Sequence, residues 1–141
     1  MNVIEQQNQA RIDIRNILDS LGFKDGANLT HDEIEMEQGV IYWNEELEES
    51  LAKTKASYLV YTISSPSDFI DVDNYHLKGR INFIINLLTT LPQESKKTYD
   101  LLYKIENGFI SAGWRVKVEN NFYDTKAKLH QYTFTIGKLY G

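Results

Sequence analysis

The sequence predicts a single α+β domain in which two helices cover one face of a mainly antiparallel sheet of four to five strands. Three observations predict this class. An amphipathic helix pattern opens the chain, a long stretch of strict two-residue alternation lies at its centre, and a second helix pattern precedes two shorter alternating segments. The predicted order is helix, three strands, helix, two strands (α-β-β-β-α-β-β), in one domain over residues 1–141.

The first helix is predicted over residues 3–21, where apolar residues recur at spacings of three and four. Gly22 stands where a helix often ends in a left-handed residue. The polar side of this helix is unusually rich in amides. Residues 22–33 contain an Asp-Gly turn signal and are predicted to form a loop, and the acidic stretch 31–37 is interpreted as part of a flexible loop.

The next segments are predicted to supply the first strands of the sheet. Residues 40–43 are a short β-prone run, and residues 45–55 suit a helical turn or two. The segment "SYLVYTIS", residues 57–64, is apolar on both faces, which is typical of a central strand. Residues 65–74 are predicted to form a connecting loop with a short extended piece at 69–72.

The stretch "NYHLKGRINFIINLLT" predicts one long central strand over residues 75–89, with one continuous apolar face. Such a strand is roughly 50 Å long, whereas a compact domain of this size is only about 37 Å across. Gly79 is a candidate position for a bend or bulge. Near the end of the strand, Ile84 and Leu88 make the second face apolar too.

The C-terminal part predicts a helix over residues 94–112, capped by Gly113, and then a hairpin. The hairpin strands are predicted at 114–119 and 129–139, joined by a turn over 120–128. The aromatic residues predicted to lie in the core are Tyr58, Phe83, Trp114, Tyr132 and Phe134.

The composition is that of an ordinary globular protein with a mildly acidic surface. Fifteen Lys and Arg against twenty Asp and Glu give a net charge of −5, which argues against nucleic acid as the main partner. The absence of cysteine excludes disulfide and thiolate chemistry. No basic region followed by an apolar run opens the chain, and no apolar run approaches the ~20 residues that span a bilayer. We expect a protein made and used in a cytoplasm, or packaged from one.

The candidate chemical motifs are weak. His76 and His130 could approach one another if their strands pair, but no histidine has the ligand spacing of a zinc site. The segment "DVDN" starts like a calcium loop, yet the required glycine and glutamate are His76 and Asn82. The acidic stretch 31–37 is better explained as a solvated face, or as a patch that meets a basic partner. We therefore expect no enzyme, and no catalytic, metal or cofactor site.

Three features indicate assembly into a larger structure. The long strand exceeds the expected domain diameter, its last third is apolar on both faces, and the first helix presents amides suited to hydrogen-bonded subunit contact. Closing a ring would remove the exposed strand edges that such a chain otherwise carries. The residues predicted to lie at a subunit interface are Ile84, Leu88, Gln6, Gln9 and Asn16.

Three segments also resemble a known family. They are "SYLVYTI", "YHLKGRINFIINLLT" and "GFISAGWRVKVENNFYDTKAKLHQYTFTIG", with a loop and a helix between them. Their order is similar to that of the tail terminator, or tail-completion, proteins of long-tailed bacteriophages. The resemblance covers roughly residues 40–138, with the first helix agreeing in position, whereas residues 31–37 and 45–55 have no counterpart.

The resemblance implies a structural virion protein that closes into a hexameric ring on the end of the tail tube, stops its growth and docks the neck of the head. Its partners would be copies of itself, the tail tube protein and a head-completion or neck protein, with DNA passing through the ring. Asp32 and Glu35 would form an acidic surface that repels DNA. The residues predicted to contact tube or neck are Ser67, Asp68, Phe69, Asp71, Asp73, Asn121, Phe122 and Tyr123.

Two alternatives remain open at this point. The first is another neck component, such as a tail-to-head joining protein. The second is a small cytoplasmic α+β ligand-binding module or enzyme, with a pocket between the helix at 94–112 and the sheet.

Overall fold

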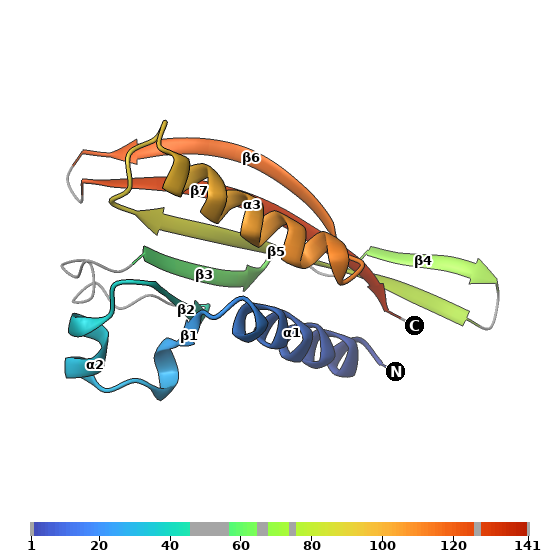
Figure 1. The fold of residues 1–141 in the computed structure, drawn as a ribbon. Coiled ribbons are helices and arrows are strands. Elements are labelled where there is room, and N and C mark those ends of the chain that lie inside the picture. The colour runs from blue at the N-terminus through green and yellow to red at the C-terminus, as the bar shows by residue number, and fades with distance from the viewer. Residues whose placement is uncertain (1, 46–56, 65–67, 74–75, 126–127, 141) are drawn as a thin grey trace.

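The computed structural model describes residues 2–45, 57–64, 68–73, 76–125 and 128–140, and it has an α+β fold built on one sheet (Figure 1). The α+β class is confirmed, but the predicted number and order of the strands are wrong, since the sheet has seven strands and a third α-helix is present. In chain order the elements are α1 (Val3–Ser20), β1 (Lys24–Asp25), the 3₁₀ helix η1 (Gly26–Asn28), α2 (His31–Met36), β2 (Val40–Asn44), β3 (Ser57–Ile63), β4 (Asp68–Asp73), β5 (His76–Thr89), α3 (Lys96–Ser111), β6 (Arg115–Asp124) and β7 (Leu129–Tyr140).

The sheet is mixed rather than mainly antiparallel. Its spatial order is β1-β2-β3-β5-β7-β6, and β4 pairs with β5 outside this path. The pairs β1–β2 and β2–β3 are parallel, and the remaining pairs are antiparallel. The additional strand β1 falls within a segment that was predicted to be a loop, whereas β4 contains the short extended piece predicted at 69–72. β1 has only two residues, which is too short to produce a two-residue pattern.

The predicted long strand is β5, and it organises the main core. Its side chains at Ile81, Phe83, Ile85 and Leu87 are fully buried, as the alternation predicts. The same core contains buried residues of α1 and α3, so both helices lie over this face of the sheet. The members from the two helices are Ala10, Ile14, Leu18, Ile105 and Phe109. The five aromatic residues predicted to be core are all buried.

Both long helices begin and end where the sequence indicates. The side chain of Asn2 caps the first turn of α1, and Ser95 caps that of α3. Past their ends, Gly22 and Gly113 have φ values of +84° and +90°, the left-handed conformation that glycine adopts without steric cost. Within the described residues, none of the helices combines the length and the apolar composition that a bilayer-spanning segment requires.

Two tyrosine–aspartate hydrogen bonds fix α1 to the sheet. The hydroxyl of Tyr140, on β7, donates to Asp13 at 2.6 Å, and the hydroxyl of Tyr42, on β2, donates to Asp19. Burial and the acceptor carboxylate both raise the pKa of each phenol above its ordinary value. Both tyrosines therefore remain neutral in the folded protein at any pH near neutrality.

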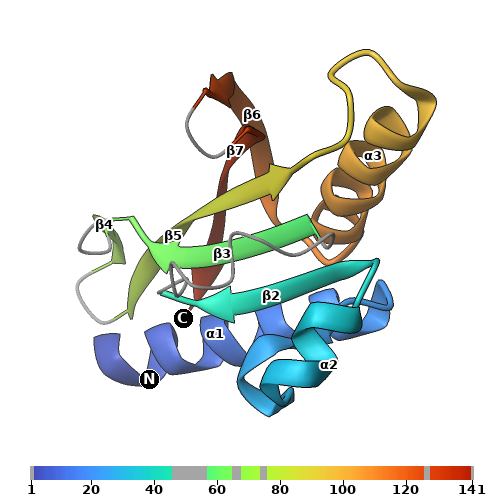
Figure 2. The ribbon, with the colours of Figure 1, turned by 90° about the vertical axis from the view of Figure 1, so that its left-hand side faces the viewer.

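A second, smaller core lies on the other face of the sheet. Ile34 of α2 packs there with Ile41 and Tyr58, and Leu88 contacts the same cluster. Ile41, Tyr58 and Leu88 alternate with residues of the main core along β2, β3 and β5, which places the two cores on opposite faces. Figure 2 shows α2 beside β2.

The segment 31–37 is thus mainly helical, which corrects the prediction of an acidic loop. The hydroxyl of Thr30 accepts from the N–H of Glu33, and the Glu33 carboxylate accepts from the N–H of Thr30. This reciprocal capping box satisfies two N–H groups that the end of a helix would otherwise leave unpaired. It stabilises a helix that is too short to show an apolar stripe in the sequence.

We predict that stability falls steeply as the pH rises above about 10, the ordinary pKa of tyrosine. The phenols of Tyr42 and Tyr140 have raised pKa values in the folded state, so they stabilise the fold fully below pH 10. Above that pH the unfolded chain releases these protons while the folded chain retains them. Urea unfolding across this range measures the decline, and the double variant Tyr42→Phe, Tyr140→Phe should show a shallower one. An equally steep loss of stability in both proteins would contradict the role of Tyr42 and Tyr140 in this pH dependence.

Candidate functional site

The first half of β5 forms an arm with β4, which accounts for the unusual length of the strand. β4 pairs with β5 from Asp68 opposite Arg80 to Asp73 opposite His76, whereas β3 pairs with β5 only as far as Ile63 opposite Phe83. Figure 1 shows this two-stranded arm extending past the ends of the helices. The strand is longer than the rest of the domain because its first residues extend beyond the end of β3 and pair with β4.

Gly79, predicted as the position of a bend or bulge, carries no bulge. Gly79 is in register with Phe69 on one side and with Tyr140 on the other. The register shift of the arm lies on the partner strand, between Asp71 and Asp73. A bulge increases the local twist of the strands that it joins.

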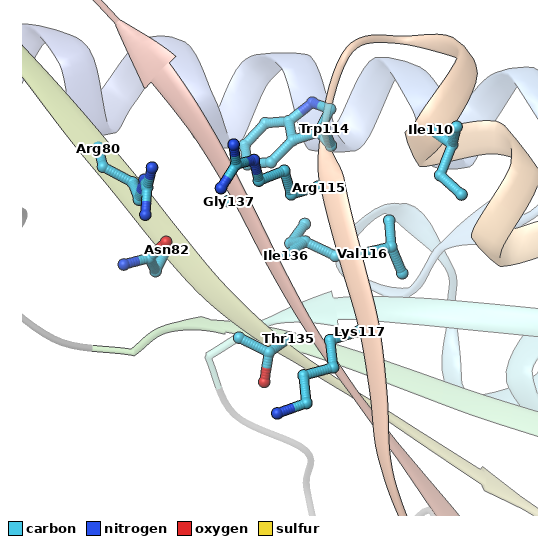
Figure 3. A pocket seen from close by; sticks show the side chains of 10 residues that line it. All are labelled: Arg80, Asn82, Ile110, Trp114, Arg115, Val116, Lys117, Thr135, Ile136 and Gly137. Atoms are coloured by element: carbon cyan, nitrogen blue, oxygen red, sulfur yellow. The ribbon is translucent and has the colours of Figure 1, made fainter.

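A groove of about 550 Å³ lies over β5, β7 and β6 at the base of the arm (Figure 3). Arg80 comes from β5, while Arg115 and Lys117 come from β6, so three cationic side chains line it. Gly137 of β7 lies in register between Asn82 and Arg115. A methyl group at Gly137 would overlap the side-chain oxygen of Asn82, so the glycine keeps the floor of the groove low.

The groove has a net positive charge. The Lys117 Nζ lies 3.6 Å from Glu119 Oε1, and Glu119 also accepts a hydrogen bond of 2.9 Å from Thr135. Among the described side chains, neither Arg80 nor Arg115 has an ion-pair partner. Two guanidinium groups on a protein of net charge −5 therefore form a local site of attraction for an anionic group.

The opposite charge gathers on α2. Glu33 and Glu37 already have partners: the N–H of Thr30 lowers the pKa of Glu33, and the ammonium group of Lys24, 2.7 Å away, lowers the pKa of Glu37. Asp32 and Glu35, the residues predicted to form an acidic surface, are both exposed to solvent. Glu35 lies 3.0 Å from the imidazole of His31, one turn earlier.

The two apolar residues predicted at a subunit interface differ in position. Leu88 packs against the second core of its own chain, so its side chain supports the fold. Ile84 is half-buried on the same face of β5, opposite Thr62 and Thr135. It stays a candidate for contact with another protein.

The predicted amide surface of α1 is only partly at the surface. Gln6 is 1% exposed, and its Nε2 donates to the backbone oxygen of Tyr140 at 3.3 Å, so it is not available to a neighbouring subunit. Gln6 lies four residues before the buried Ala10, so both side chains are on the face of α1 that is directed toward the sheet. Gln9 donates to Asp13 at 2.9 Å, and Asn16 is exposed.

The residues predicted for two contact loops lie mainly in strands. Asp68, Phe69, Asp71 and Asp73 belong to β4, and Ser67 lies outside the described residues, as do almost all of residues 45–55. The predicted turn over 120–128 is too long, because Asn121, Phe122 and Tyr123 belong to β6 and pair with β7. A bulge between Val118 and Asn120 interrupts the alternation there, which hides the rest of the strand. Tyr123 is half-exposed, with its ring centroid 4.7 Å from that of His130.

The two strand histidines do not meet. His76 lies opposite Asp73 in the arm, whereas His130 lies opposite Thr89 at the other end of β5. Within the described residues, no group of three or more His, Asp or Glu side chains is arranged to hold a metal ion.

Two surface features were missed by sequence reasoning. The cations of the groove stand at alternate positions of predicted strands, but the sequence does not reveal that β7 brings β5 and β6 together. Tyr99, Tyr103 and Ile110 are about half exposed on the outer side of α3. Their helical spacing was visible in the sequence, although the aromatic residues were interpreted as mostly core.

Sequence comparison assigns no family to the chain. No family model matches the chain, and no curated protein matches it in sequence. The groove, the arm and α2 therefore have to be interpreted from their own geometry and charge.

We predict that Leu88→Asp lowers the free energy of unfolding by about 2 kcal/mol or more, because it places a carboxylate against an apolar cluster. Ile84→Asp makes the same change four residues earlier on the same face, outside this cluster, and should cost less than half as much. Urea unfolding followed by circular dichroism measures both. Equal losses in the two variants would contradict the assignment of Leu88 to the second core.

Proposed function

We propose that the protein is a structural subunit that closes into a ring on the end of a phage tail tube. The ring would stop growth of the tube and form the interface to the neck of the head. Its action would depend on shape and charge complementarity between proteins. The β4–β5 arm is the observation that carries this proposal.

The arm lacks the support that a hairpin normally needs. A two-stranded hairpin is marginally stable in water, and stable ones pack against a further strand or helix. The arm residues His76, Leu77 and Lys78 precede the part of β5 that pairs with β7, so β4 is their neighbour among the described strands. A second copy of the chain could cover the arm and form backbone hydrogen bonds with its open strand edges.

The outer side of α3 supplies a second contact surface. Tyr99 and Tyr103, one turn apart, are 50% and 63% exposed. Tyrosine is enriched in protein–protein interfaces because its ring buries a large area at low cost in side-chain entropy. This stripe suits contact with a tube or neck protein.

The resemblance to tail terminators supports the proposal that the ring is one that closes a tail tube. The three segments that carry it correspond mainly to β3, β5 and the β6–β7 hairpin. These strands are neighbours in the sheet, in the order β3-β5-β7-β6. The similarity therefore falls on one contiguous structural unit rather than on scattered positions. Another neck component would use the same arm and the same ring closure.

The groove favours one further candidate function, a module that binds a small anionic ligand. Its volume of about 550 Å³ lies within the range of small-molecule sites. Arg80, Arg115 and Lys117 would attract phosphate or carboxylate groups. Ile110 of α3 also lines it, so it lies partly between this helix and the sheet.

We predict that removing the arm abolishes assembly but not folding. Ser64 donates its N–H to Asn82 at 3.0 Å, so the chain can be closed there by a short turn. Replacing residues 66–79 with Thr-Asn-Gly would remove Pro66, which has no N–H for the ladder, extend the β3–β5 pairing by two residues and close it with a two-residue turn. The variant should keep the circular dichroism spectrum of the wild type and stay monomeric in native mass spectrometry, while the wild type forms rings.

The wild-type chain mixed with tail-tube protein from the same genome tests the tail assignment itself. Electron microscopy should show rings on the ends of tubes and shorter tubes than those formed by tube protein alone. A wild-type chain that stays monomeric with and without tubes would contradict the proposal. So would an armless variant that forms the same rings.

A further inference from the structure

The cationic groove and the acidic helix α2 lie at opposite ends of one face of the sheet. We propose that α2 of one copy docks in the groove of the next copy, an inference that rests on the proposed ring. The occupant of the groove is therefore a second copy of this chain.

The outward face of α2 combines acidic and apolar groups. Asp32, Glu35 and Met36 have the spacing i, i+3, i+4, so they share one side of the helix, while Ile34 is buried. Met36 is 81% exposed, a large apolar surface for a residue at the end of a short helix. A methionine is flexible and fills irregular hollows well, which suits it to a contact surface.

The groove offers matching groups. Arg80 and Arg115 provide two guanidinium groups that can each bind a carboxylate through paired N–H donors. Ile110 is 49% exposed and, with the half-buried Val116, gives the groove an apolar wall. Asp32 and Glu35 can pair with the two arginines while Met36 contacts this wall.

The same copy cannot supply both partners. Ile34 of α2 packs in a cluster that Leu88 contacts, whereas Arg80 lies eight residues earlier along β5. Eight strand residues span about 26 Å. The α2 face of one copy is thus out of reach of its own groove, and an intermolecular contact is required to bring the two together.

The open edge of β6 is a weaker alternative for joining copies. Within the described part of the sheet, β6 pairs with β7 alone and could accept a further strand. Its edge carries Arg115, Lys117 and Glu119, and a bulge follows Val118. Charges and bulges are the features that discourage edge pairing. When α2 docks in the groove, the cation Arg115 of this edge pairs with a carboxylate instead of opposing strand pairing.

Charge reversal tests the contact. The groove variant carries Arg80→Glu and Arg115→Glu, and the helix variant carries Asp32→Lys and Glu35→Lys. Each alone should weaken self-association at least about a hundredfold, because like charges then face each other. The matched control, Lys96→Glu with Lys97→Glu, reverses two exposed charges at the start of α3 and should assemble like the wild type.

Mixing the two variants gives the decisive result. In an alternating assembly each acidic groove faces a basic α2, and each basic groove faces an acidic α2. Native mass spectrometry should therefore show monomers for each variant alone and rings with equal numbers of both when they are combined. A chain carrying all four substitutions should assemble by itself.

Three outcomes would separate the possible failures. If wild-type rings form and the variants assemble equally well alone, the docking contact is wrong while the ring stands. If mixing restores dimers only, the contact stands and the ring is wrong. If mixing restores nothing and the groove variant loses binding to a short duplex DNA, the groove binds phosphate, which overturns the docking contact.

Discussion

The structure depends on the register of β5 with β7. The pairing runs without a shift from Gly79 opposite Tyr140 to Thr89 opposite His130. Because side chains alternate along a strand, this register fixes which residues meet the helices and which face the other side. A slip by one residue would exchange the buried Ile81–Leu87 set for Arg80, Asn82 and Asn86, leaving polar groups under α1 and α3.

That constraint links the core to the candidate contact surfaces. The odd-numbered side of β5 is covered by α1 and α3, and α1 is held there by the bonds of Asp13 and Asp19 to the two tyrosines. The even-numbered side carries Arg80 into the groove and Leu88 into the cluster beneath α2. One strand therefore sets the distance between the groove and the acidic helix, and it also continues into the arm.

The sequence predicts the elements whose patterns are long. β5, α1 and α3 have sustained periodicity and clear end signals, and their ends differ from the prediction by two residues at most. The sequence does not predict β1, which is too short, or the second half of β6, where a bulge breaks the alternation. Helix α2 has a capping box at Thr30 and Glu33 that was readable in the sequence. The groove was not readable, because it depends on the spatial order β5-β7-β6.

Hydrogen exchange can report directly whether the arm is an interface between copies. Amides of residues 76–78, which have no β7 neighbour among the described strands, should exchange at least about a hundredfold more slowly in the assembled protein than in the dilute monomer, because assembly covers the arm. Amides of residues 81–89 should be protected in both states, since they belong to the core of the sheet. Equal exchange of the arm in both states would contradict the account.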